Sequence, residues 1–263
     1  MYEYIAPFVN VTVGPWTTNK TSKVKVISSS INPVDTAEIS IPAEGVEVSS
    51  IVKDMNVITF MGYREKGTWP VFAGKVFDIS WGRNVIIYAK DMMEFLKKTT
   101  ITKSFVDASP QEIVKYALTK AGISNFTLDD TQLPLKHHFV VKNLNVIQLI
   151  KYINQSWGLD WKYYFEPEGN FYWGSWEKSN RYNGGSPIAT LEYGISLLEL
   201  KPSDKETGTL KTFLLPFIRH SQIVILRDSR FWDNEVLAKI ERITYEHGEG
   251  RTGVEAQWRI LKS

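Results

Sequence analysis

The stretches Val57-Ile58-Thr59-Phe60, Val71-Phe72-Ala73-Gly74-Lys75-Val76 and Val85-Ile86-Ile87-Tyr88-Ala89 decide the fold, because their order of parts returns later in the chain. They form a pattern of strand, polar loop, long strand, turn and closing strand. The same order recurs over residues 223–258. A repeated supersecondary unit predicts a chain that is built from two like modules.

The two copies match in side-chain type rather than in identity. Three further pairs follow when Val71 is laid on Val236 and Gly74 is skipped: Val76 with Ile240, Ile79 with Ile243, and Trp81 with Tyr245. The apolar face of the long strand changes partway along, which predicts a bulge or bend, and we expect Gly74 to be the bulge residue. Bent antiparallel strands curl a sheet into a barrel.

The hydrophobic pattern of the region between the two copies has a different period. Ser109 and Asn145 each begin a helical pattern with a capping-box partner three residues later, and residues 159–176 predict an aromatic hairpin. The expected fold class is therefore α+β and mostly β, with two related antiparallel β-barrel-like modules flanking a small α/β module. Residues 1–101 form the first β module, 102–186 the middle module and 187–263 the second. Within the last of these we expect one strand over residues 191–200 and a hydrophilic loop over 201–209.

Composition narrows the functional classes. The chain has 263 residues, of which 43% are hydrophobic, enough for real cores. Lys plus Arg number 31 against 29 Asp plus Glu, so we expect no specific nucleic-acid binding. The chain has no cysteine, which excludes disulfides and thiolate catalysis. No apolar run reaches membrane-spanning length, and the first residues lack signal-peptide features, so we expect no membrane insertion.

Candidates for catalysis are few. His137 and His138 are adjacent on a predicted strand and therefore point to opposite faces, which does not suit a shared metal ion. Asp129-Asp130 and the pair Glu166/Glu168 lie in turn contexts, where acidic residues are expected in any case. We therefore predict no catalytic residues, no cofactor and no metal site, and hence a protein that is not an enzyme.

Aromatic residues are dense between residues 157 and 176, and two interpretations stay open. Flat aromatic rings on a hairpin could stack on sugars or form a protein interface. Alternatively, Trp161, Tyr163 and Phe165 pack on the helix that ends at Trp157. On the second interpretation Tyr164 and Tyr172 are the residues that we expect to be exposed.

Two equivalent loops carry the residue types that are enriched in interface hot spots. They hold Tyr63, Arg64 and Trp69 in the first copy, and Arg230, Phe231 and Trp232 in the second. We predict that both loops contact a repeating partner. The closing strand of the first copy is apolar on both faces, so we also expect Ile86 and Tyr88 to be covered, by the middle module or by a neighbouring chain.

The order of parts resembles that of the late control protein D family, the baseplate hub proteins of contractile phage tails, with relatives in R-type bacteriocins and other contractile injection systems. The resemblance spans nearly the whole chain. It rests on the stretches at residues 54–60, 71–76, 89–96, 108–114 and 121–123, and from 215 onward. One departure is that residues 215–221 lack the Gly-Asp turn expected before the second-copy strand.

The resemblance implies a homotrimer whose six β modules form a pseudo-sixfold ring, joining a hexameric tail tube to a trimeric spike. It implies the tail tube protein, the spike protein and other baseplate proteins as partners, and a location in a virion or phage-like particle made in the host bacterial cytoplasm. A carbohydrate-binding or cell-wall-degrading tail component is the alternative. A tail-tube or spike-adaptor protein would share the β modules but would not need the middle module.

Overall fold

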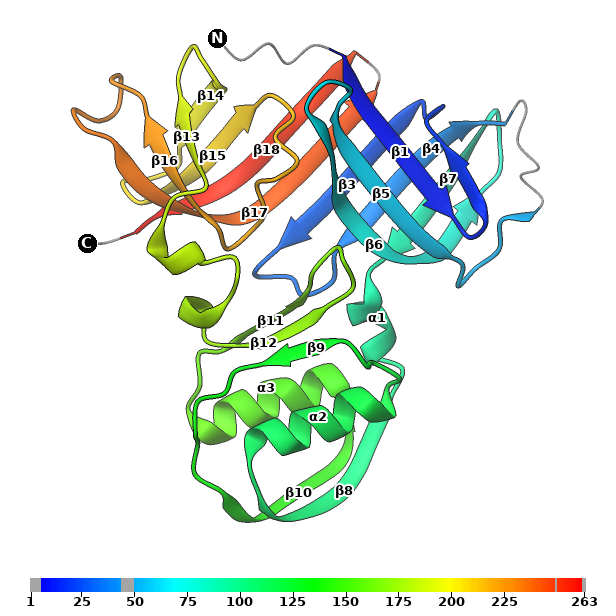
Figure 1. Cartoon of the computed structure of the whole chain (residues 1–263), viewed down its shortest axis with the longest axis vertical. Helices are drawn as coiled ribbons and strands as arrows, with labels where there is room; N and C mark the ends of the chain where they lie inside the picture. The colour runs from blue at the N-terminus through cyan, green and yellow to red at the C-terminus, as the bar shows by residue number, and fades with distance from the viewer. Residues whose placement is uncertain (1–5, 44–49, 249, 262–263) are drawn as a thin grey trace. The chain divides into compact units, whose positions relative to one another are not determined.

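The computed structural model describes residues 6–43, 50–248 and 250–261. The chain divides into two compact units (Figure 1). Unit 1 combines Met1–Asp91 with Asn180–Ser263, and unit 2 is the intervening segment Met92–Ser179. The two ends of the sequence therefore build one unit together, with unit 2 inserted between them along the chain.

The first part of unit 1 is a set of strands that ends at residue 90. Buried valines alternate with half-buried lysines along residues 23–26, which is the period-two pattern of a strand with one core face. The strands are β1 (Pro7–Val13), β2 (Trp16–Thr18), β3 (Lys23–Ser29), β4 (Thr36–Pro42), β5 (Asn56–Tyr63), β6 (Gly67–Ser80) and β7 (Asn84–Lys90).

The second part of unit 1 corrects two sequence predictions. A turn at residues 194–196 divides the strand expected over residues 191–200, and part of the expected loop at 201–209 is strand. The strands are β13 (Ala189–Glu192), β14 (Leu197–Pro202), β15 (Thr207–Thr212), β16 (Ile223–Arg227), β17 (Val236–Gly248) and β18 (Arg251–Ile260), after the short 3-10 helix η3 (Asn183–Gly185).

All thirteen of these strands belong to one sheet. The order is β14-β15-β18-β17-β3-β4-β7-β6-β5-β1-β2, with β16 on β17 and β13 on β16. Every pairing is antiparallel except that of β13 with β16. Side chains from both parts form one hydrophobic core, in which Phe72, Tyr245 and Trp258 are among the largest fully buried residues. The two β modules are thus halves of a single sheet with a shared core.

Unit 2 contains helices packed with two small sheets. Its elements are α1 (Met92–Leu96), β8 (Thr100–Ala108), α2 (Pro110–Lys120), β9 (Phe126–Leu128), β10 (Lys136–Asn145), α3 (Val146–Trp157), β11 (Lys162–Phe165), β12 (Phe171–Gly174) and the 3-10 helix η2 (Trp176–Lys178). β8 pairs with β10, and β12 pairs with β11 and with β9.

The capping boxes predicted at Ser109 and Asn145 are present. Ser109 and Glu112 exchange hydrogen bonds at the start of α2, and Asn145 and Gln148 do so at the start of α3. Gly158 ends α3 in the left-handed conformation that glycine adopts most readily. None of the described helices has the length and apolar composition that a membrane span requires. The predicted class, α+β and mostly β with two related antiparallel modules around a small α/β module, is confirmed.

Candidate functional site

The meanders β5–β6–β7 and β16–β17–β18 have the same connectivity, and their long strands are irregular at the same place. The register skips Phe77 in β6 against β7, and it skips Glu241 in β17 against β18. These two residues are equivalent in the sequence alignment of the copies. The predicted change of face is therefore confirmed, and the shared bulge position supports the repeat.

The prediction that Gly74 is the bulge residue is wrong. Gly74 pairs with Val57 in β5, and its lack of a side chain instead lets β6 and β7 approach each other closely. A Cβ atom on Gly74 would lie 2.2 Å from the carbonyl oxygen of Lys90, at the end of β7. Only glycine leaves room for the backbone to pass there.

The two modules join where β3 pairs with the C-terminal half of β17, over Arg242–Gly248. We call this pairing the internal joint. Tyr245 lies opposite Val26 in it and is only 2% exposed. An ion pair also crosses it, with Lys25 Nζ 3.0 Å from Glu246 Oε1. The internal joint is thus a packed strand-to-strand contact between two like modules.

Two positions that correspond to the two sides of the internal joint have no partner strand among the described residues. In the first module Trp81, which aligns with Tyr245, directly follows β6 and is 55% exposed. Among the described strands none pairs with β6 beyond Ser80. In the second module β14 occupies the place of β3, because β18–β15–β14 repeats the order β7–β4–β3, and β14 is the last strand of the sheet. The first module therefore has an open edge on β6, which corresponds to the edge of β17. The second module has an open edge on β14, which corresponds to the edge of β3.

The outer face of the first module carries a groove of about 460 Å³. Phe77, Tyr88 and Lys90 line it, and Lys90 Nζ lies 3.6 Å from the centroid of the Phe77 ring. Tyr88 is 39% exposed, and Ile86 on the same strand is half-buried. That a partner covers Ile86 and Tyr88 stays a prediction.

The first of the two predicted contact loops divides into an inner and an outer part. Tyr63 is buried at the end of β5, and the ring centroid of half-buried Trp69 lies 5.9 Å from that of Phe217. Arg64 is exposed, with its guanidinium carbon 5.9 Å from the centroid of the Phe8 ring. In the chain itself Tyr63 and Trp69 pack within unit 1, and Arg64 extends outward.

The second loop divides in the same way. Trp232 is half-buried with its ring centroid 5.7 Å from that of Trp258, whereas Phe231 is exposed. Arg230 is held by two hydrogen bonds to Asp228, Nε to Oδ1 at 2.8 Å and Nη2 to Oδ2 at 2.6 Å, and it stacks 3.3 Å from the centroid of the Tyr193 ring. These contacts present a rigid cation on the outside of the loop.

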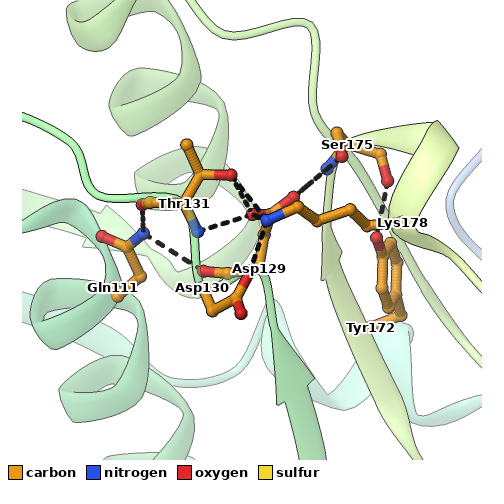
Figure 2. A network of polar contacts seen from close by, with 7 residues as sticks. All are labelled: Gln111, Asp129, Asp130, Thr131, Tyr172, Ser175 and Lys178. Carbon is orange, nitrogen blue, oxygen red and sulfur yellow. Dashed lines mark hydrogen bonds and ion pairs between the residues drawn. The ribbon is translucent and has the colours of Figure 1, made fainter.

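The acidic pair considered as catalytic carboxylates lies in a polar network of unit 2 (Figure 2). Asp129 Oδ1 accepts from the backbone N and Oγ1 of Thr131 at 2.8 and 2.6 Å. Its Oδ2 accepts from the backbone N and Oγ of Ser175 at 3.0 and 2.8 Å, and Lys178 Nζ lies 3.1 Å from Oδ1. Gln111 donates to the carbonyl oxygens of Asp129 and Thr131.

Burial by itself raises the pKa of Asp129, but the hydrogen bonds from Thr131 and Ser175 outweigh it and hold the pKa well below its ordinary value. A carboxylate that is ionised and saturated with donors cannot deliver a proton near neutral pH. Asp129 therefore ties the residues that precede β10 to the segment after β12. The arrangement serves structure rather than acid–base chemistry.

The aromatic hairpin packs inward. Trp173 and Phe171 are fully buried, and the Trp173 ring lies 4.6 Å from that of Trp161. The expectation that Tyr164 and Tyr172 are exposed is wrong, since each is only 5% exposed and their rings stack 5.3 Å apart. Most of these rings are thus buried within unit 2, and no row of stacked, exposed rings is present on the described hairpin.

Unit 1 also buries a histidine–arginine pair. The Nη1 of Arg181 contacts the Nε2 of His220, and both side chains are buried. Because arginine can only donate, Nε2 accepts and the ring is neutral, which leaves Nδ1 to donate to Ser221 Oγ at 3.0 Å. Burial, and then the nearby charge of Arg181, lower the pKa of His220 well below 6.5.

Sequence reasoning paired Trp81 with Tyr245 but did not select Trp81 as a functional residue. The missing information was the pairing of β3 with β17, which joins residues more than two hundred positions apart. The available signal was the repeat alignment itself, which places an aromatic residue at the same point of both copies.

No protein-family model matches this sequence, and no curated protein matches it. Solved structures do. A tail protein from Neisseria meningitidis MC58 superposes with a TM-score of 0.76 at 12% identity, over 98% of this chain and 97% of that one. The 43 kDa tail protein of prophage MuSo2 from Shewanella oneidensis gives a TM-score of 0.76 at 10% identity, over 98% of each chain.

The E. coli c3393 protein, a component of the type VI secretion system, matches at a TM-score of 0.67 and 8% identity, over 96% of this chain and 77% of that one. At such low identity these likenesses establish the fold. The chain therefore has the fold of phage tail proteins and of a type VI secretion component.

Proposed function

We propose that this chain is the structural hub of a tail baseplate in a phage or phage-like particle. Three copies form a ring of six β modules that joins a hexameric tail tube to a trimeric central spike. The partners are further copies of the chain, the tail tube protein, the spike protein and other baseplate proteins. The role is structural, without catalysis.

The internal joint is the observation that carries this proposal. In it two like modules of this fold associate edge to edge, and among the described strands the complementary edges of β14 and of the C-terminal end of β6 have no partner strand. Contacts of this head-to-tail kind form rings when the rotation closes. A permanent ring of this type should bury on the order of 2,000 Å² or more at each interface.

The insertion of unit 2 supports the adaptor role. Each chain contributes two β modules but a single unit 2. A trimer therefore repeats its β modules six times and unit 2 three times. Such a particle can present approximate sixfold symmetry to one neighbour and true threefold symmetry to another, which is what a connector between a hexamer and a trimer requires.

Light scattering and electron microscopy of the purified chain test the proposal. We expect the mass of three chains, and class averages that show a threefold ring with six similar lobes. A chain that remains monomeric at every concentration, or that forms a twofold particle, contradicts the proposal. In parallel, assays of glycan binding and of peptidoglycan release should be blank, and a monomer with either activity would favour the carbohydrate-binding or wall-degrading alternative.

A further inference from the structure

We propose that the open edge of β14 in one copy docks beside Trp81 of the next copy, and that this contact closes the ring. We call it the external joint. The inference rests on the proposed function and specifies which strands of two copies meet. Its occupant is a second copy of the chain, because the internal joint already shows what this kind of edge binds.

The register of the external joint follows from that of the internal one. Within the chain Thr244 lies opposite Ile27. The equivalent of Thr244 in the first module is Ser80, since each residue follows an aligned isoleucine. Ile27 lies opposite Thr36 in β4, and Thr207 of β15 corresponds to Thr36. The backbone N–H of Ser203 donates to the carbonyl oxygen of Thr207, so Ser203 corresponds to Ile27. The external joint therefore places Ser80 opposite Ser203.

One residue further along, the same transfer places Trp81 opposite Pro202, where the internal joint has Tyr245 opposite Val26. The two aromatic positions differ in burial as this predicts: 2% exposure for Tyr245, which has its partner strand, and 55% for Trp81, which lacks one. Tryptophan is among the residues most enriched in interface hot spots. Docking of β14 would give Trp81 the environment that Tyr245 already has.

The external joint is shorter than the internal one. β6 ends at Ser80, which faces Ser203 just beyond β14, and β14 ends at Pro202, which faces Trp81 just beyond β6, so the two strands meet only at their ends. Proline has no backbone N–H to donate, and it is tolerated on outer strands. Few ladder hydrogen bonds can therefore form, so burial of Trp81 has to contribute most of the stability of this contact.

A disulfide between copies tests the geometry, because the chain has no cysteine of its own. Opposite residues of antiparallel strands have Cα atoms about 4.5–5.5 Å apart, within the range that a disulfide spans. We expect the variant Ser80→Cys/Ser203→Cys to form covalent dimers and trimers under mild oxidation, seen on a non-reducing denaturing gel. Ile27→Cys/Thr244→Cys is the matched control, which should form the equivalent bond within one chain and stay a single-chain band.

The outcomes separate the two proposals. Native trimers by light scattering without covalent trimers in Ser80→Cys/Ser203→Cys, while the control pair does oxidise, overturn the external joint and leave the hub proposal standing. A chain that never trimerises contradicts the hub proposal, and the external joint with it. Trimers without cross-links also mean that a different surface of the copies meets.

A substitution gives a second, independent readout. Trp81→Ala should weaken association of the copies roughly thirtyfold or more at each interface, as for truncation of a hot-spot residue, while the melting temperature of the monomer stays unchanged. Val106→Ala, an exposed apolar residue of unit 2, is the control and should leave association unchanged. Equal association of the Trp81→Ala variant and the unaltered chain would overturn the external joint.

Discussion

Asp129 shows what a single buried charge does in this protein. Both of its carboxylate oxygens are occupied by donors from two separate segments, so its charge is satisfied rather than reactive (Figure 2). Sequence reasoning identified the turn around Asp129 but could not see Ser175 or Lys178, which are more than forty residues away along the chain. From the sequence alone, a polar residue whose hydrogen bonds are all satisfied in the fold cannot be distinguished from one that is available for chemistry.

Replacing Asp129 with Asn should destabilise unit 2 by roughly 2–3 kcal/mol, because an amide nitrogen would face donors at one of the two oxygen positions. Asp130→Asn is the matched control: Asp130 also contacts Lys178 but is exposed, so a change within about 0.5 kcal/mol is expected. Urea unfolding at pH 7 measures both. Because the pKa of Asp129 is lowered in the folded state, its contribution is full above its ordinary value of 3.8 and is lost as the pH falls further. The difference in the free energy of unfolding between the unaltered chain and the Asp129→Asn variant should therefore become smaller in acid.

The buried His220 should make the stability of unit 1 fall in mild acid. Its pKa is lower in the folded state, so the unfolded chain takes up the proton first as the pH drops. The free energy of unfolding therefore keeps its full value above about pH 6.5 and declines below it, by up to about 1.4 kcal/mol for each pH unit. His220→Gln should flatten this decline between pH 6.5 and 5. An unchanged slope in that variant would mean that His220 is not the titrating group, with half-buried His247, whose pKa burial also lowers, as the next candidate.

At the scale of elements, much of the fold could be predicted and the failures share a cause. Helices α2 and α3 were found because capping boxes and glycine stops are local signals. β8 was not, because only three of its nine residues are buried and its pattern lacks alternation. β15 was not, because its polar residues resemble a loop and only its pairing with β14 and β18 makes it a strand.

The close approach of β6 and β7 at Gly74 gives a prediction at this scale. Gly74→Ala would bring a Cβ atom to 2.2 Å from the backbone oxygen of Lys90, so one of the two strands has to move. We expect a loss of roughly 2–3 kcal/mol in the free energy of unfolding. Gly82→Ala is the control, since its added Cβ atom would be in ordinary contact, 3.6 Å from the nearest atom. Equal stability of the two variants in chemical denaturation would show that β6 and β7 do not approach closely at Gly74.

At the scale of the whole molecule, the repeat was visible in the sequence, whereas the union of both copies in one sheet was not. The alignment of Trp81 with Tyr245 implied two like modules, and nothing in either copy showed that β3 supplies an edge to β17. Strand pairing between distant segments depends on backbone edges, which have no residue-type signature. The sequence thus predicted the parts of the candidate assembly surface but not the contact that relates them.

Unit 2 is continuous in sequence and has its own buried residues, so residues 92–179 should fold when produced alone. Circular dichroism should show a cooperative thermal transition, and amide signals in an NMR spectrum should be well dispersed. A matched fragment, residues 1–91 alone, should not fold, because it lacks the strand that covers β3. A folded 1–91 fragment, or an unfolded 92–179 fragment, would contradict this division.

The pairing of β3 with β17 also constrains how the polypeptide matures on the ribosome. Strand β3 is synthesised more than two hundred residues before β17, the strand that covers its edge. Until β17 has been made, the nascent chain exposes an uncovered strand edge, which is a template for unwanted aggregation. A chaperone that shields this edge until β17 has emerged should therefore raise the yield of native protein.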